Sequence, residues 1–174
     1  SGNTDNVINT NDRVAMGYPT VPEIIYGFGP SIKFKNLDFS FFFQGAARTS
    51  LMMSGFHPFV GNSNTARRGV LDFVAENCWT TTNPNEFAKY PRLTSKDNLN
   101  NNQNSSYWLR DASFLKLKNA EIGYTIKNMR FYISGSNLLT ISSFKLWDPE
   151  MGGGSGMKYP TQRTINFGFQ MTIN

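Results

Sequence analysis

The chain has 174 residues, a formal net charge of +5 and an aromatic content of 14%, which includes 15 phenylalanines. It contains no run of about 18 apolar residues, which excludes a transmembrane helix, although the strands of a membrane barrel need only about 9–11 alternating residues each. The basic residues are dispersed and belong to no recognised nucleic-acid-binding motif, so we expect no nucleic-acid partner.

The chain begins with a polar segment, residues 1–23, which lacks a strand pattern and is expected to be loop. Residues 24–34 and 37–46 then alternate large apolar side chains with small or polar ones. This predicts two strands, because successive side chains of a strand point to opposite faces. Only Lys35-Asn36 separates them, and so short a connection predicts a hairpin whose two apolar rows share one face.

A long segment rich in Asn, Ser, Thr and Gly follows at residues 47–111. A connection of this length is improbable inside a compact soluble domain, so we interpret it as a functional surface loop. Within it, residues 66–77 place Val70, Phe73 and Val74 on one helical face, which predicts a short helix.

Two further strands are expected over residues 112–126 and 129–140, joined by Lys127-Asn128 alone. Their alternation and two-residue connection predict a second hairpin, in which the asparagine takes the left-handed conformation that such a turn needs. The apolar residues change phase near Lys118-Asn119, which a β-bulge or a passage out of the membrane zone explains.

A second loop is expected over residues 141–160 and a last strand over 161–173. Tight turns thus alternate with long loops along five candidate strands, as in transmembrane barrels, where the turns are periplasmic and the loops extracellular. The predicted fold class is all-β, with antiparallel strands belonging to a transmembrane barrel. Five strands cannot close such a barrel, since the smallest bacterial ones have about eight, so we expect the chain to be part of a larger protein.

The two faces of the expected strands differ strongly, one being large and aromatic and the other small or polar. A soluble β-sandwich buries its apolar face against a second sheet, whereas an outer-membrane barrel turns that face to lipid and its polar face to a wet lumen. The second face is too polar for a core, which favours the barrel. The residues expected to face lipid are Tyr26, Phe28, Phe39, Phe41, Tyr124, Phe131, Phe167 and Phe169.

No catalytic constellation is present, so we do not expect an enzyme. The single Cys78 cannot form an internal disulfide, and the single His57 has no ligand cluster around it, so we expect neither a cofactor nor a metal site. Asp148 and Glu150 lie close enough in the sequence to be considered as paired carboxylates for glycoside hydrolysis. An Asp directly before Pro149 is more typical of a turn that fixes a loop, and we favour that interpretation.

Three tryptophans, Trp79, Trp108 and Trp147, lie in or beside the expected extracellular loops. An exposed indole can stack on a sugar, which makes the three residues candidates for substrate binding. The alternative is that they pack the long loops against their neighbours or form an aromatic belt at the membrane interface.

Three segments carry a family resemblance: YWLRDASFLKLKNAEIGYTI (107–126), RFYISGSNLLTISSFKLWDPE (130–150) and YPTQRTINFGFQMTIN (159–174). Together, in this order, they resemble the C-terminal end of the SusC/RagA family of TonB-dependent outer-membrane transporters. The similarity extends from about Ile24 onward. It implies a barrel of about 22 strands with an N-terminal plug domain, of which this chain would supply closing strands but no plug.

The resemblance also implies energised import of oligosaccharides or peptides across the bacterial outer membrane, driven through TonB. The expected partners are the remainder of the barrel and its plug, a SusD-like surface lipoprotein that covers the mouth, the TonB complex, and outer-membrane lipid with lipopolysaccharide. Two other functions remain open at this point. One is a secreted β-sandwich that binds carbohydrate, and the other is an outer-membrane adhesin barrel without transport.

Overall fold

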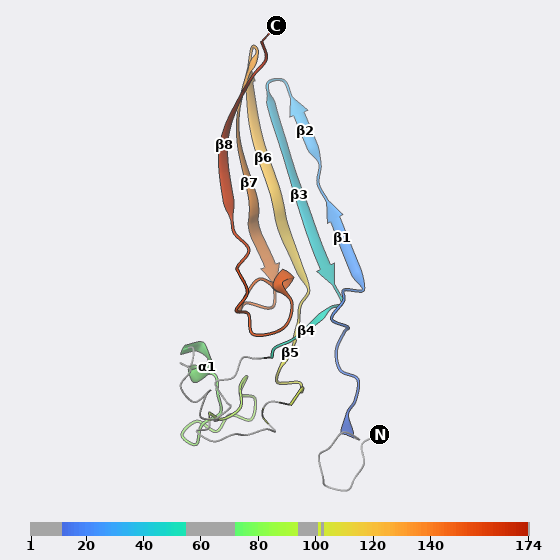
Figure 1. Cartoon of the computed structure of the whole chain (residues 1–174), viewed down its shortest axis with the longest axis vertical. Helices are drawn as coiled ribbons and strands as arrows, with labels where there is room; N and C mark the ends of the chain where they lie inside the picture. Colours follow the sequence, from blue (N-terminus) through green and yellow to red (C-terminus); the bar gives the residue numbers. More distant parts are fainter. Residues whose placement is uncertain (1–11, 55–71, 94–100, 102, 174) are drawn as a thin grey trace.

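A computed structural model describes residues 12–54, 72–93, 101 and 103–173 (Figure 1). Within these residues, six strands form one antiparallel sheet in the order β1-β3-β6-β7-β8, with β2 also paired to β3. The strands are β1 (Ile24–Phe28), β2 (Ser31–Phe34), β3 (Leu37–Ala47), β6 (Phe114–Ile126), β7 (Met129–Ser142) and β8 (Thr164–Met171).

The smaller elements lie at one end of this sheet (Figure 1). Strands β4 (Ser50–Met52) and β5 (Leu109–Asp111) pair with each other, and a 3-10 turn, η3, spans Pro149–Met151. The helix expected over residues 66–77 is α1, Asp72–Glu76, and its earlier part lies outside the described residues. Within the described part of the chain, no helix has the length and apolarity to cross a membrane.

Both predicted hairpins are present, with Phe34 paired to Leu37 and Ile126 paired to Met129. The conformation of the turns differs from the expectation, because the left-handed residues are Lys35 and Lys127, at φ 52° and 53°. A positive φ therefore lies at the first position of each loop and not at the second. The expected left-handed asparagine is therefore wrong.

The first expected strand, residues 24–34, is broken into β1 and β2 at Gly29-Pro30. Proline has no backbone N–H to donate to the ladder, and proline therefore interrupts strands or stays at sheet edges. The Pro30 carbonyl still accepts a hydrogen bond from the Phe41 N–H, at 3.3 Å. The two pieces therefore continue along the same edge of β3.

The phase change expected near Lys118 is a register shift. β6 pairs Leu117 with Leu139 and then Asn119 with Ser136, which leaves Lys118 out of the ladder. Cross-strand partners share a face, so a bulge moves all later residues of a strand to the opposite face.

The bulge explains an apparent conflict in the sequence. Lys116 pairs with Gln44 and Thr140 on the polar face, whereas Ala120, at the same odd–even parity, pairs with Phe41 on the apolar face. If residue 118 were paired in the ladder and the strand alternated without a bulge, the lysine would lie among the aromatic residues.

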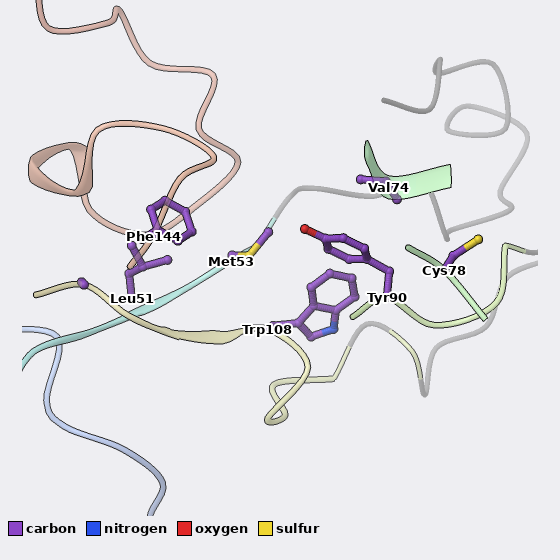
Figure 2. Packing of buried hydrophobic residues seen from close by; sticks show 8 residues of the cluster. Leu51, Met53, Val74, Cys78, Tyr90, Trp108 and Phe144 are labelled. Atoms are coloured by element: carbon purple, nitrogen blue, oxygen red, sulfur yellow. The ribbon is translucent and has the colours of Figure 1, made fainter. Parts of the chain in front are cut away.

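The main sheet has no second layer over its apolar face among the described residues (Figure 1). The buried cluster lies instead in the segments at the loop end (Figure 2), and it consists of Leu51, Met53, Val74, Cys78, Tyr90, Trp108, Ala112 and Phe144. A β-sandwich requires two sheets with a shared core, so this architecture does not fit that alternative.

Candidate functional site

The polar face of the sheet carries an ionic cluster near the tight turns. Arg130 of β7 binds the Asp38 carboxylate of β3 with two nitrogens, donates to Glu121 of β6 at 2.6 Å and donates to Gln170 of β8 at 3.3 Å. Its guanidinium also lies 4.9 Å from the ring centroid of Tyr132. One arginine thus ties four neighbouring strands together on this face.

The apolar face carries most of the aromatic residues of the sheet. The eight residues expected to face lipid all lie on this face. Cross-strand partners share a face, and the pairing of Phe131 with Tyr124 and with Phe169 is continued by apolar pairs on the remaining strands. Phe131 and Phe169 pack with ring centroids 5.1 Å apart. Phe167 remains 79% exposed within this chain. The exposed members of the set are Tyr26, Phe28, Phe39, Tyr124, Phe131, Phe167 and Phe169, and Phe41 is half-buried.

The two long connections form one structural unit at the other end, which we call the loop assembly: the described residues of 48–113 together with 143–157. The Gly154 N–H donates to the Met52 carbonyl at 2.9 Å, and the Ser54 N–H donates to the Gly154 carbonyl at 3.0 Å. Phe144, from the second connection, is buried in the core of the first. The loop assembly therefore has a hydrophobic core of its own.

The structure separates the three candidate tryptophans. Trp108 is 5% exposed, donates its indole N–H to the Asn101 carbonyl at 2.8 Å and lies against Tyr90 (Figure 2). An indole buried to this degree presents no free face to a sugar, so the expected sugar contact is corrected to a packing role for Trp108.

The other two tryptophans are partly buried. Trp147 donates its indole N–H to the Gly152 carbonyl at 2.9 Å and packs edge-on against Phe144, at 4.6 Å between ring centroids. Trp79 lies 5.9 Å from the guanidinium of Arg92, measured to the ring centroid. The structure thus packs Trp147 against the loop core, and both Trp147 and Trp79 keep part of their surface exposed.

Asp148 fixes the loop, as its position before Pro149 suggested. Its carboxylate accepts a hydrogen bond from the Glu150 N–H at 3.1 Å and caps η3. The sequence did not reveal its second partner: the ammonium of Lys116 contacts the carboxylates of both Asp148 and Glu150, the latter at 2.5 Å. Lys118 adds a contact with Glu150 at 2.6 Å.

Lys116 is completely buried. Burial raises the pKa of Asp148 and of Glu150 and is the largest single effect on each. The hydrogen bonds that the two carboxylates accept, with Lys116 the first of the donors, and the positive charge of Lys116 together outweigh it, so both pKa values lie below their ordinary range. The two carboxylates are therefore ionised at neutral pH, and the cluster has the character of a salt bridge. Two lysines, one at the phase change and one just before it, were the only signal for the cluster in the sequence.

Among the residues that the structure describes, no group of three or more His, Cys, Asp or Glu side chains could hold a metal ion. His57 lies outside the described residues. The thiol of Cys78 is buried and donates to the Ala75 carbonyl at 3.2 Å.

No family model matches the chain. The chain is 32% identical to the TonB-dependent receptor P26 of Formosa agariphila over 195 residues, a match that covers 98% of this chain and 19% of that protein. It is 25% identical to the TonB-dependent receptor SusC of Bacteroides thetaiotaomicron over 181 residues, covering 97% of this chain and 17% of that protein. The chain thus spans about a fifth of the length of the relatives that it matches.

The fold also matches solved structures. The RagAB peptide importer in its open-open state is similar with a TM-score of 0.74 and 23% identity, covering 99% of this chain and 20% of that one. Its closed-closed state gives the same TM-score and identity over 95% of this chain and 19% of that one. At this identity the likeness shows the fold alone.

Proposed function

Because this chain is a segment of the outer-membrane β-barrel of the TonB-dependent receptors of the SusC/RagA type, we propose that the protein containing it imports a nutrient across the bacterial outer membrane. One observation carries the proposal: the sheet exposes an aromatic face and a polar face, with no second layer over the aromatic one among the described residues. An exposed apolar surface of this kind needs an apolar environment. Lipid on one side and a wet lumen on the other satisfy both faces.

The orientation follows from the lengths of the connections. The tight turns at residues 35–36 and 127–128 form the periplasmic rim, and the connections at 47–111 and 141–160 lie outside the cell, since barrels of this class have short periplasmic turns and long extracellular loops. The aromatic face contacts lipid at the eight positions named above. The loop assembly then stands at the extracellular mouth, close to lipopolysaccharide.

The free edges of the sheet require further strands. Among the described residues, β1 and β2 pair only with β3, and β8 pairs only with β7. Unpaired strand edges have no hydrogen-bond partners in lipid, so the rest of the barrel must pair with both. The polar face, with the Arg130 cluster near its periplasmic end, lines the lumen that a plug domain occupies.

We assign oligosaccharides or peptides as the cargo class, with TonB supplying the energy and a SusD-like lipoprotein covering the mouth. The polar lumen face suits a hydrated polymer, and the similar fold of a peptide importer supports the peptide option. The relatives are named as receptors and importers, in agreement with a function other than catalysis.

Uptake by cells tests the proposal. A strain lacking the full-length protein is compared with one expressing it, each with and without functional TonB, for growth on an oligosaccharide or a peptide mixture as the sole carbon source. We expect growth on one of these sources to require both the receptor and TonB. Equal growth of all four strains on every source, with the barrel present in the outer membrane, would refute transport and favour the adhesin.

A further inference from the structure

The connection between β7 and β8 crosses the loop end of the sheet instead of extending away from it (Figure 1). Residues 144–157, which we call the strap, carry η3 and the Gly152-Gly153-Gly154 sequence. The strap is attached on two sides, once to the barrel wall and once to the other long connection.

The attachment to the wall is ionic and buried. The side chain of Lys116, on the polar face of β6, has an exposed fraction of 0%, and its ammonium binds Asp148 and Glu150 of the strap. The side chains of the two carboxylates remain 17% and 24% exposed.

The attachment to the other connection is made by backbone and core contacts. Gly154 forms a parallel bridge with Met53, directly after β4. Gly153 lies so close to β4 that an added Cβ would come within 2.6 Å of the Met52 carbonyl oxygen. Phe144 is buried in the shared core.

We propose that Lys116 is the anchor of a fixed strap, which locks the connection between β7 and β8 to the lumen wall and makes the strap and the described residues of 48–113 one rigid body at the mouth. Breaking a buried ion pair by removing one partner is strongly unfavourable, because the remaining charge is left uncompensated. The strap therefore does not open alone. Any rearrangement of the mouth moves the strap together with the rest of the loop assembly.

Hydrogen exchange in the full-length receptor, measured by mass spectrometry in detergent, tests this directly and does not depend on transport. Lys116→Met keeps the length of the side chain and removes the charge. We expect amide exchange in the strap to rise about tenfold or more, with a parallel rise at Ser54, whose N–H bonds to Gly154. Exchange in β7 should not change. Lys145→Met removes an exposed lysine of the same strap and serves as the matched control.

Equal exchange in the Lys116→Met and Lys145→Met receptors would overturn the anchor role. A rise in the strap without a rise at Ser54 would overturn the single rigid body. If the Lys116→Met barrel fails to assemble, hydrogen exchange is measured in the Glu150→Gln receptor instead, because this variant leaves the Lys116–Asp148 pair in place. We expect about a threefold rise in strap exchange for Glu150→Gln, and an unchanged strap would then refute the proposal.

Discussion

A lysine on the aromatic face should destabilise the barrel most near the middle of the membrane. The apolar band of such barrels is about 25 Å tall and the strands tilt by about 40°, so roughly ten residues of a strand cross it. Counted from the turn at 127–128, Ile133 of β7 lies near the centre of that band. It pairs with Ile122 and Phe167 on the aromatic face, and 45% of it is exposed within this chain.

The expected cost of Ile133→Lys has two parts. A lysine on the lipid face costs about 2–4 kcal/mol at the midplane, falling to about 0–1 kcal/mol near the interfaces. The lost isoleucine surface adds about 1–2 kcal/mol at ~25 cal/mol per Å². We therefore expect Ile133→Lys to lower the free energy of unfolding of the barrel by about 3–6 kcal/mol. Met129→Lys, beside the turn, should lower it by less.

Guanidinium unfolding of the full barrel in lipid bilayers, followed by tryptophan fluorescence and by the mobility shift on boiling, measures this loss. Ser134→Lys is the matched control, since it changes the next residue on the polar face, opposite Glu121. We expect it to cost less than about 1 kcal/mol. Similar losses for Ile133→Lys and Ser134→Lys, or a larger loss for Ser134→Lys, would refute the assignment of the two faces.

Three further predictions concern the loop end and the lumen. The pKa values of Asp148 and Glu150 are lowered on folding, so their stabilising contribution is complete above about pH 4.5 and is lost as the pH falls below it. Proteolysis of the strap should therefore become faster between pH 5 and about pH 3. An unchanged rate of proteolysis would contradict the sign of the pKa shift. Gly168→Val should lower the free energy of unfolding in guanidinium by about 1–3 kcal/mol, because the new Cβ would collide with the Tyr132 ring. Adding Tyr132→Ala should recover most of the lost stability. No recovery in the double variant would exclude this clash. Trp108→Ala should lower the free energy of unfolding by about 3–5 kcal/mol and make the loop assembly sensitive to protease. Retained protease resistance would show that the indole is dispensable for packing.

The hairpins of this chain were predictable because two local signals agreed, a period of two and a connection of two residues. The break at Gly29-Pro30 was not predicted, since the apolar alternation continues through Pro30 even though its missing N–H interrupts the ladder. The left-handed lysines were missed for a related reason. Residue preference pointed to the asparagine, whereas the turn type determines which position has the positive φ.

The contacts at the loop end were much less predictable. The partners of Lys116 follow it by 32 and 34 residues, in a connection without periodicity. Nothing local indicates that a lysine in a strand becomes fully buried. The burial of Trp108 likewise depends on Tyr90, which belongs to a part of the chain without a strand pattern. Long-range packing decided both cases, and a single sequence contains little information about it.

The register shift at Lys118 makes this one position tolerant of two kinds of mutation. A substitution there leaves the pairing of Leu117 and Asn119 intact, because residue 118 has no ladder partner. Deleting the residue would let Leu117 follow Asn119 in ordinary alternation, so that Lys116 would stay on the polar face and Leu117 on the aromatic face. Only a pairing that took Lys118 into the ladder would exchange the sides of the segment from Phe114 to Leu117. One residue outside the ladder thus keeps this segment facing the same way as the strand that it pairs with.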